Sequence, residues 1–330
     1  VGRERGGRRE SALRVTTTML TNRIRSHVGV GAASGRPNKP SSQAFGSGRR
    51  GAAKKVGRAV QRERAQLACR AIEDSSPSDG EVVPVTFQAA GDDELYGGCK
   101  AIVFGATGKT GEEIVKSLLK VAVPSSVFAR DVKKANDMFK SDIETEGVSV
   151  YEGDLTRYED VTKAIESSAC NVVFIASGSR PAMDPLGPFA VDYNGTCNIV
   201  AAAKKQGSVK HIVLVTSIGV DDILFPLNLF WGVLFWKKRA EEVLQRSGIK
   251  YTIVRPGGLK DEGAAGAIQM DKADAFGLPP RKTPGSILRS QVADVCVEAL
   301  VQSGASNKTV EIIAEENSPV VPLAEQFEKI

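Results

Sequence analysis

Residues 99–120 read CKAIVFGATGKTGEEIVKSLLK. The apolar run at residues 101–104 is typical of a buried strand, and three glycines follow it at Gly105, Gly108 and Gly111. After the last glycine, apolar side chains recur at the spacing of an amphipathic helix. The stretch therefore predicts a strand, a tight glycine-rich turn and a helix that packs back onto the strand.

Each of the three glycines has a mechanical role when such a turn joins a strand to a helix. Gly105 allows the tight turn, Gly108 lets the backbone approach a pyrophosphate, and Gly111 lets the helix pack close to the strand. The first amides of the helix then face the phosphates. We expect this turn to hold a dinucleotide, although a loop that is glycine-rich for other reasons gives the same pattern.

The charge of the chain is divided unevenly. Residues 1–72 hold 14 Arg, 3 Lys and 3 Glu, a net charge of +14, so the remaining residues carry −9 of the overall +5. Because the part expected to fold is acidic, nucleic acid is not an expected partner. The two histidines, His27 and His211, are far apart and have no companion ligands, so no metal site is expected.

The first part of the chain also differs in composition. Residues 1–75 are rich in Arg, Ser, Gly and Ala and show little apolar periodicity, which predicts no packed core. An Arg-rich, acid-poor leader is typical of an organelle transit peptide, and residues 66–71 (QLACRA) resemble a plastid processing site. The alternative is a basic disordered tail that binds RNA or anionic surfaces. Residues 76–97 are expected to form an acidic linker.

From Cys99 onward, predicted strands and helices alternate. This rhythm predicts an α/β domain at residues 98–330, a Rossmann-type doubly wound parallel sheet with strand order 3-2-1-4-5-6-7 and helices on both faces. Within it, residues 257–290 are expected to form a small substrate or lid region, and 261–285 to be a loop. The expected strands are 101–104, 126–129, 148–151, 171–176, 211–216, 251–254 and 310–314, and the later helices are 132–139, 158–167, 190–205, 229–246, 291–301 and 323–330.

Ligands of such a sheet bind beyond the carboxyl ends of its strands. The turn after the first strand contributes Thr107, Lys109 and Thr110 beside its glycines. The second strand ends at Arg130, whose guanidinium suits the 2′-phosphate of NADP(H), with Lys109 as a second cation. Asp131 follows, and we expect its side chain to point the other way. The alternative for Arg130 is a solvated cation at the end of the strand.

Later strand ends complete the expected dinucleotide site. Asp154 and Leu155, after the third strand, are placed to cover an adenine with one hydrogen bond and one apolar contact. Asp154 is alternatively the N-cap of the following helix, and the two roles are compatible. Ala176, Ser177 and Gly178, after the fourth strand, are small residues beside the expected ribose, and Ser217 follows the fifth strand.

Several motifs together produce a family resemblance. They are VFGATGKTG (103–111), GDL (153–155), VTSIG (215–219), WKKRAE (236–241) and YTIVRPGGL (251–259). On these motifs, Cys99–Ile330 resembles an atypical short-chain dehydrogenase/reductase of the NmrA-like NAD(P)-binding group. More narrowly, residues 228–242 and 310–330 resemble the dehydrogenase-like part of the NAD(P)-binding subunit of the chloroplast inner-envelope translocon, Tic.

The resemblance implies a cofactor site and a departure from the family's catalysis. Enzymes of the superfamily use a Ser, and a Tyr four residues before a Lys; here Ser217 and Lys237 match, but the tyrosine position holds Val233. Valine has no proton to give to a substrate carbonyl, so no catalytic residue is assigned. The resemblance implies that Lys237 holds the nicotinamide-ribose hydroxyls and that Pro256 borders the nicotinamide. A plain surface lysine is the alternative for Lys237.

The most apolar stretch of the chain is Ile223–Trp236, ILFPLNLFWGVLFW. It holds 14 residues, whereas a helix that spans a bilayer needs about 20, so no transmembrane span is expected. One interpretation is a loop and helix start packed on the sheet. The other is an exposed apolar surface that contacts a membrane or a protein partner. The resemblance favours the second interpretation, because the plastid relative is a peripheral membrane protein.

These patterns lead to one leading hypothesis and two alternatives. The leading hypothesis is a plastid NADP(H)-binding protein of the stroma, or of an envelope or thylakoid surface. It would be a redox-responsive binding or assembly factor with weak or no dehydrogenase activity of the family's usual kind. The first alternative is an NADPH-dependent oxidoreductase whose acceptor, such as a quinone, needs no general acid. The second alternative is a scaffold with a vestigial nucleotide site.

Overall fold

A computed structural model describes residues 96–145, 147–179, 184–264 and 266–330. The expected transit peptide at 1–75 and nearly all of the expected linker lie outside these ranges, so both remain predictions. The expected domain at 98–330 falls almost entirely within them.

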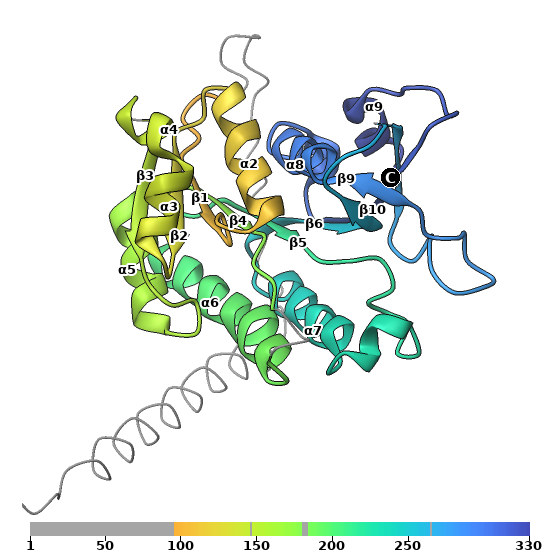
Figure 1. The fold of residues 1–330 in the computed structure, drawn as a ribbon, viewed down its shortest axis with the longest axis horizontal. Helices are drawn as coiled ribbons and strands as arrows, with labels where there is room; N and C mark the ends of the chain where they lie inside the picture. Colours follow the sequence, from red (N-terminus) through yellow and green to blue (C-terminus); the bar gives the residue numbers. More distant parts are fainter. Residues whose placement is uncertain (1–95, 146, 180–183, 265) are drawn as a thin grey trace, which may run out of the picture. The chain divides into compact units, whose positions relative to one another are not determined.

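The sheet has the strand order predicted from the sequence (Figure 1). Seven parallel strands run in the order β3-β2-β1-β4-β5-β6-β10, and Ile102 lies opposite Ser126 on one side and Val173 on the other. The doubly wound Rossmann-type fold is therefore confirmed. Its strands are β1 (Ala101–Phe104), β2 (Ser125–Ala129), β3 (Val148–Glu152), β4 (Val172–Ile175), β5 (His211–Val215), β6 (Lys250–Pro256) and β10 (Lys308–Glu315).

Three short strands extend the sheet beyond β10. β8 (Ala267–Lys272) and β9 (Ser286–Leu288) pair antiparallel with β10, and β7 (Gly258–Lys260) pairs with β9. The expectation that 261–285 is entirely loop is wrong at β8. Ile268 and Met270 alternate with polar residues there and pack against the core, a signal that the surrounding Gly and Pro obscure.

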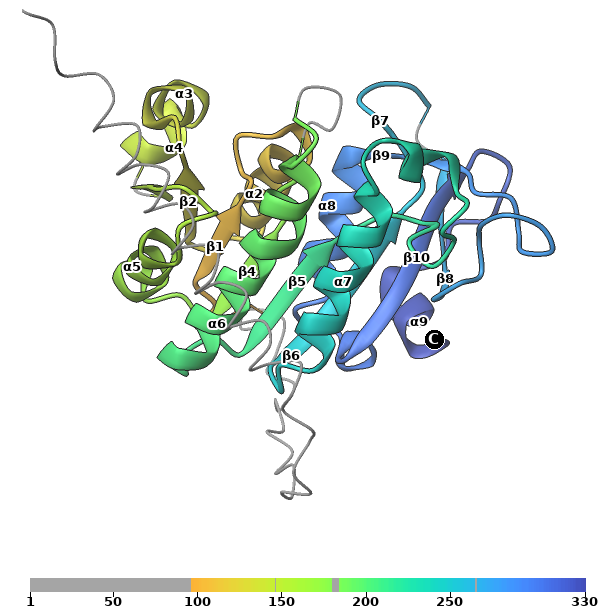
Figure 2. The same cartoon turned by 90° about the horizontal axis from the view of Figure 1, so that it is seen from below.

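Helices cover both faces of the sheet (Figure 2). One face carries α2 (Lys109–Lys120), α3 (Val132–Met138), α4 (Lys140–Glu144), α8 (Arg289–Glu298) and α9 (Leu323–Glu328). The other carries α5 (Tyr158–Ser168), a π-helical turn η2 (Pro188–Gly195), α6 (Thr196–Gln206) and α7 (Val233–Gln245). Because both faces are covered, the central strands are nearly continuous apolar runs.

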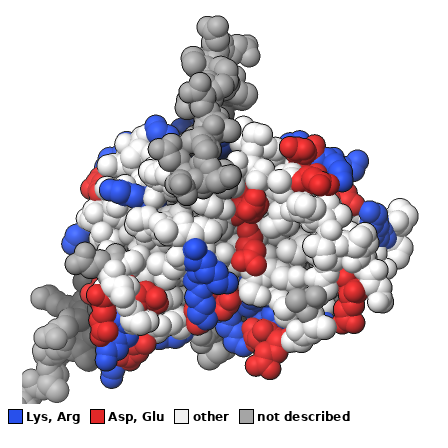
Figure 3. All heavy atoms as spheres, turned by 90° about the horizontal axis from the view of Figure 1, so that it is seen from above, with Lys and Arg blue, Asp and Glu red and all other residues white. Residues whose placement is uncertain are grey.

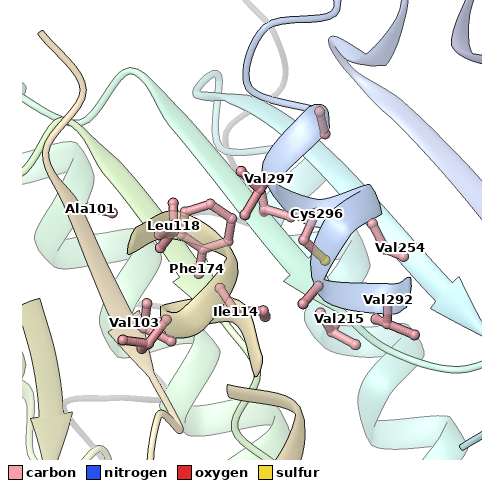
Figure 4. Close-up of a cluster of buried hydrophobic side chains, with 14 of the residues drawn as sticks. Ala101, Val103, Ile114, Leu118, Phe174, Val215, Val254, Val292, Cys296 and Val297 are labelled. Atoms are coloured by element: carbon pink, nitrogen blue, oxygen red, sulfur yellow. The ribbon is translucent and has the colours of Figure 1, made fainter. Parts of the chain in front are cut away.

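The core on the α2 and α8 face is built from aliphatic side chains (Figure 4). Ile114 and Leu118 of α2 lie against β1 and β4, while Val292 and Cys296 of α8 lie against β5 and β6. This packing holds the first turn of α2 against the sheet, at the glycine-rich turn.

The expected helix at 229–246 begins later than predicted. Trp231 and Gly232 both have positive φ angles, of 57° and 66°, so α7 starts at Val233, after a 3₁₀ turn η3 (Pro226–Leu229). A left-handed residue cannot continue a right-handed helix, and glycine tolerates that conformation best. In the part of the chain that the structure describes, no helix is both long and apolar enough to cross a bilayer.

Candidate nucleotide site

The β1–α2 turn is closed so tightly that two of its glycines have no room for a side chain. Gly105 has φ of +88°, and a Cβ there would lie 2.5 Å from the Ser177 nitrogen. A Cβ on Gly111 would lie 2.2 Å from the Gly105 oxygen. Gly108 caps α2 without any side-chain hydrogen bond, so the first amides of α2 keep their capacity to bind an anion.

A cavity of about 560 Å³ opens beside this turn, where β1, β2, β3 and β4 end. Some of the residues that line it were predicted from the sequence, each at its own strand end, and the others were not predicted. The predicted residues that line it are Gly105, Thr107, Gly108, Arg130, Asp154, Leu155, Ala176, Ser177 and Gly178. Its further lining includes Phe128, Ala129, Asp131, Lys134, Ser179, Asp184, Gly187 and Val191.

The cavity is basic where β2 ends. Arg130 lines it together with Lys134, which follows one turn later on α3 and donates to the Thr107 oxygen at 2.7 Å. The Asp131 carboxylate accepts from the Lys134 backbone nitrogen at 3.0 Å and so caps α3, while Asp131 also belongs to the cavity lining. Lys134 was not among the residues predicted from the sequence, and because Arg130 precedes the N-cap of α3, helical spacing does not connect the two.

The end of β3 is polar on one side and apolar on the other. Asp154 Oδ1 accepts from the nitrogen and the hydroxyl of Thr156, at 2.9 and 2.8 Å, which fixes the loop before α5. The N-cap position of α5 is Arg157, so the alternative that Asp154 caps this helix is wrong. Leu155 lies next to it, and its oxygen accepts from the Asn198 side chain at 2.9 Å.

The end of β4 presents buried hydroxyls that lack partners. Among the residues that the structure describes, the hydroxyls of Ser177 and Ser179 are buried and make no hydrogen bond. Both serines line the cavity. A buried hydroxyl without a partner costs free energy, so a polar ligand such as a ribose would satisfy them. No sequence signal had pointed to Ser179.

Six other predicted residues lie outside the lining of this cavity. Thr110 is in the first turn of α2, and Lys109 forms an ion pair with Asp261 beyond β7. Pro256 ends β6, and Ser217 follows β5, where its hydroxyl donates to the Ile218 oxygen at 3.0 Å. Lys237 does not line the cavity, and its Nζ forms an ion pair of 2.6 Å with Asp192. Gly111 serves the turn itself, as described above.

A buried ion cluster fixes the ends of β6 and β10. The Arg255 guanidinium, in a residue that is 1% exposed, makes two bonds to Glu241, of 3.0 and 2.7 Å, and one of 3.3 Å to Glu311. Burial opposes its charge, but Glu241 and the neighbouring Asp221 and Asp274 outweigh burial and raise the pKa of Arg255. Because Arg255 precedes Pro256, this cluster holds the predicted nicotinamide end of the site in place.

The described part shows no metal centre, and the face in Figure 3 shows no extended basic surface. Groups of three or more His, Cys, Asp or Glu side chains that could hold a metal do not occur among these residues. On the face in Figure 3, cationic and anionic side chains are interspersed among uncharged ones.

Residues 105–303, which contain the glycine turn and the cavity, match the model of the NAD(P)H-binding family. The chain belongs to this family. An uncharacterized chloroplastic protein of Arabidopsis thaliana is 41% identical over 229 residues, which cover 67% of this chain and 78% of that protein. The rice TIC 62 protein, also chloroplastic, is 36% identical over 245 residues. The alignment with it covers 69% of this chain and about half, 48%, of the rice protein.

The fold has close counterparts among solved structures of dinucleotide-dependent proteins. A Bacillus halodurans protein assigned to the NAD-dependent epimerases and dehydratases superposes with a TM-score of 0.59 at 26% sequence identity. The superposition covers 71% of this chain and all of that protein. The predicted resemblance to the short-chain dehydrogenase/reductase group and to the plastid Tic branch is thus confirmed.

Proposed function

We propose that this protein binds NADP(H) in the chloroplast and acts as a redox-responsive binding or assembly factor, with little dehydrogenase activity of the usual kind. One observation carries the proposal: the glycine turn, Arg130 and the ends of β3 and β4 line one cavity, whereas Val233 stands at the position of the family's proton-donating tyrosine. The chloroplast location is supported by the chloroplastic relatives from Arabidopsis and rice. The oxidoreductase alternative keeps the same cofactor but requires an acceptor that needs no acid.

The residues of the cavity suit each part of NADP(H). The free amides at the start of α2 suit the pyrophosphate, and Arg130 with Lys134 suits the 2′-phosphate, since two cations on one side of the cavity match its charge. Asp154 and Leu155 suit the adenine, through one hydrogen bond and one apolar contact. Ribose hydroxyls would pair with the buried serine hydroxyls at the end of β4.

The absence of a proton donor at the tyrosine position limits the chemistry. NADPH supplies a hydride, and reduction of a carbonyl also requires a proton at the carbonyl oxygen. Val233 is the first residue of α7 and carries no proton, and the Ser217 hydroxyl is engaged with a backbone oxygen. Binding without efficient carbonyl reduction is what this set of side chains supports.

An exposed apolar surface supports a role in contacts. Large apolar side chains of η3, of the residues on either side of it and of the first turn of α7 are exposed to solvent. They are Ile223, Leu224, Leu227, Leu229, Phe230, Trp231 and Phe235. The segment is held in shape by Asn228, whose side chain donates to two backbone oxygens and accepts from the nitrogens of Leu234 and Phe235. We propose this apolar surface as the contact site for a membrane or a protein partner.

A titration of the full chain with NADPH and NADH, read out by thermal shift, tests the proposal. A ligand present at 100 times its dissociation constant stabilises the folded state by about 2.7 kcal/mol. We expect NADPH to stabilise at lower concentration than NADH, and Gly108→Asp to abolish both effects. Steady consumption of NADPH with carbonyl or quinone acceptors, lost in Gly108→Asp, would favour the oxidoreductase alternative. Lack of binding at millimolar NADPH would leave only the scaffold.

A further inference from the structure

Asp192 is a buried carboxylate that joins α7 to the wall of the cavity. It lies in the π-helical turn η2, and its side chain is 1% exposed. One oxygen, Oδ1, pairs with Lys237 Nζ of α7 at 2.6 Å. The other, Oδ2, accepts from the backbone nitrogen of Ser179 at 3.1 Å. A single side chain thus contacts both the family's cofactor lysine and a cavity-lining residue.

The position of this carboxylate relative to the cavity follows from Gly178. A Cβ built on Gly178 would lie 3.9 Å from Asp192 Oδ1, so the carboxylate lies close to the backbone that lines the cavity after β4. Lys237, whose side chain is 17% exposed, is therefore brought to the same wall although it comes from α7.

The surroundings favour a fixed geometry for the pair. Phe189 and Tyr193 of η2 contact Trp236 of α7, with ring centroids 4.8 and 5.5 Å apart. These aromatic contacts hold η2 against α7 at the residues next to Asp192 and Lys237. A carboxylate this deeply buried requires a partner charge, so the lysine ammonium is held at Asp192 and does not sample solvent freely.

The turn in which Asp192 lies is itself unusual. In the described chain, the π-helical geometry covers Pro188–Gly195 and changes to an α-helix at Thr196. A π turn shifts side chains around the helix axis relative to a continuous α-helix, and such turns are frequent at functional sites. Here the shift accompanies the placement of Asp192 between the lysine and the strand end.

We propose that Asp192 is a positioning residue that aims Lys237 at the nicotinamide ribose. A lysine ammonium has three donors. One donor is used by Asp192, which leaves two for the two hydroxyls of that ribose. The inference rests on the proposed NADP(H) site. It adds Asp192, which contacts both Lys237 and the Ser179 backbone nitrogen.

The test compares two ligands on the full chain by calorimetry. NADPH contains the nicotinamide ribose, whereas adenosine 2′,5′-bisphosphate contains only the adenine half with its 2′-phosphate. Asp192→Asn keeps the shape and the acceptor for Ser179 but loses the charge. We expect this variant to lower the affinity for NADPH about tenfold, as for loss of one charge-assisted hydrogen bond. Its affinity for the bisphosphate should stay within about twofold of that of the wild-type chain.

A second variant shows whether Asp192 acts through the lysine. Asp192→Asn/Lys237→Gln replaces the ion pair by two amides and avoids an unpaired buried charge. Because the proposed effect passes through Lys237, the double variant should bind NADPH within about twofold of Asp192→Asn. Glu316→Gln, which removes an exposed carboxylate outside the cavity lining, is the control and should change neither affinity.

Three results would overturn the proposal. A parallel loss of both ligands in Asp192→Asn would mean that the residue shapes the whole cavity, and unchanged NADPH binding would mean that Lys237 is aimed without it. A further large loss in the double variant would show that the two residues act separately. If the wild-type chain bound neither ligand, the proposed function itself would fall, a result distinct from these three.

Discussion

Lys109, the lysine of the glycine turn, forms an ion pair with Asp261, which lies 152 positions later in the chain. Asp261 also pairs with Arg289, the first residue of α8, so one carboxylate joins the N-terminal ends of α2 and α8. The hydrogen bond from Lys109 lowers the pKa of Asp261. This partner draws Lys109 away from the cavity, in which the sequence had placed it.

Release of Lys109 should therefore strengthen cofactor binding. In Asp261→Asn the ammonium loses its competing carboxylate and becomes available to a phosphate. We expect NADPH affinity to rise roughly two- to fivefold, the modest range of an exposed charge contact. Calorimetry measures the change, and in a Lys109→Ala background the same substitution should have no effect. A gain that persists in that background would refute the competition.

The two cations at the end of β2 should set the cofactor preference. Arg130→Ala is expected to lower the affinity for NADPH by roughly 10- to 100-fold, because charge-assisted hydrogen bonds to the 2′-phosphate are lost, and to lower the affinity for NADH by far less. Lys134→Ala should act in the same direction but less strongly, because Lys134 is also held by the Thr107 oxygen. Titration of both cofactors measures the ratio. If Arg130→Ala weakened the binding of both cofactors equally, Arg130 would not be a contact of the 2′-phosphate.

The close contact of Gly111 makes it intolerant of a side chain. Gly111→Ala would place a methyl group 2.2 Å from the Gly105 oxygen, so α2 must move from the sheet. We expect a loss of about 1–3 kcal/mol in the free energy of unfolding together with weaker NADPH binding. Gly258→Ala is the control, since its Cβ would find its nearest neighbour at an ordinary 3.6 Å. Denaturant unfolding that gave equal stability for both variants would contradict the packing role.

The sequence predicted best the features that depend on neighbouring residues. The turn at Gly105–Gly111 and the strand end at Arg130 and Asp131 follow from local spacing, and the parallel strand order follows from the alternation of elements. For the turn and the strand end, the residues that determine the structure are within a few positions of one another, and for the strand order each strand and helix is recognised from its own short segment.

The features that the sequence did not reveal depend on contacts between distant segments. Nothing near Lys109 signals that Asp261 will face it, and nothing near Lys237 signals the carboxylate of Asp192. These pairs exist because the sheet brings the ends of β4, β7 and the adjoining helices to one edge. The start of α7 was likewise hidden, since left-handed Trp231 has no sequence signature.

Membrane contact through the exposed apolar surface can be tested by introducing negatively charged side chains into that surface. Leu224 and Leu229 are 84% and 87% exposed, so replacing both with Asp should change the free energy of unfolding by less than about 1 kcal/mol. We expect the wild-type chain to float with lipid vesicles and the double variant to remain in the soluble fraction. Val320→Asp, at a residue that is 86% exposed elsewhere, is the control and should still float. Equal flotation of all three would exclude this surface as the membrane contact.

His211 should make the fold sensitive to mild acid. Burial, assisted by the charge of Lys250, lowers the pKa of His211 from 6.5 to about 3. Thr252 uses its hydroxyl proton on the Ala305 oxygen at 2.8 Å, so the neutral imidazole donates from Nε2 to the Thr252 oxygen at 2.9 Å.

Because the folded-state pKa lies below the unfolded one, the stabilisation by His211 is complete above pH 6.5 and is lost as the pH falls toward 3. Within that window one proton binds on unfolding, so the free energy of unfolding should drop by about 1.4 kcal/mol per pH unit from this residue. Denaturant titrations from pH 7.5 to 4.5 measure the slope. His211→Gln retains a side-chain donor for Thr252 but does not titrate, so its slope should be shallower by that amount. Identical slopes in the two proteins would show that another group governs the acid sensitivity.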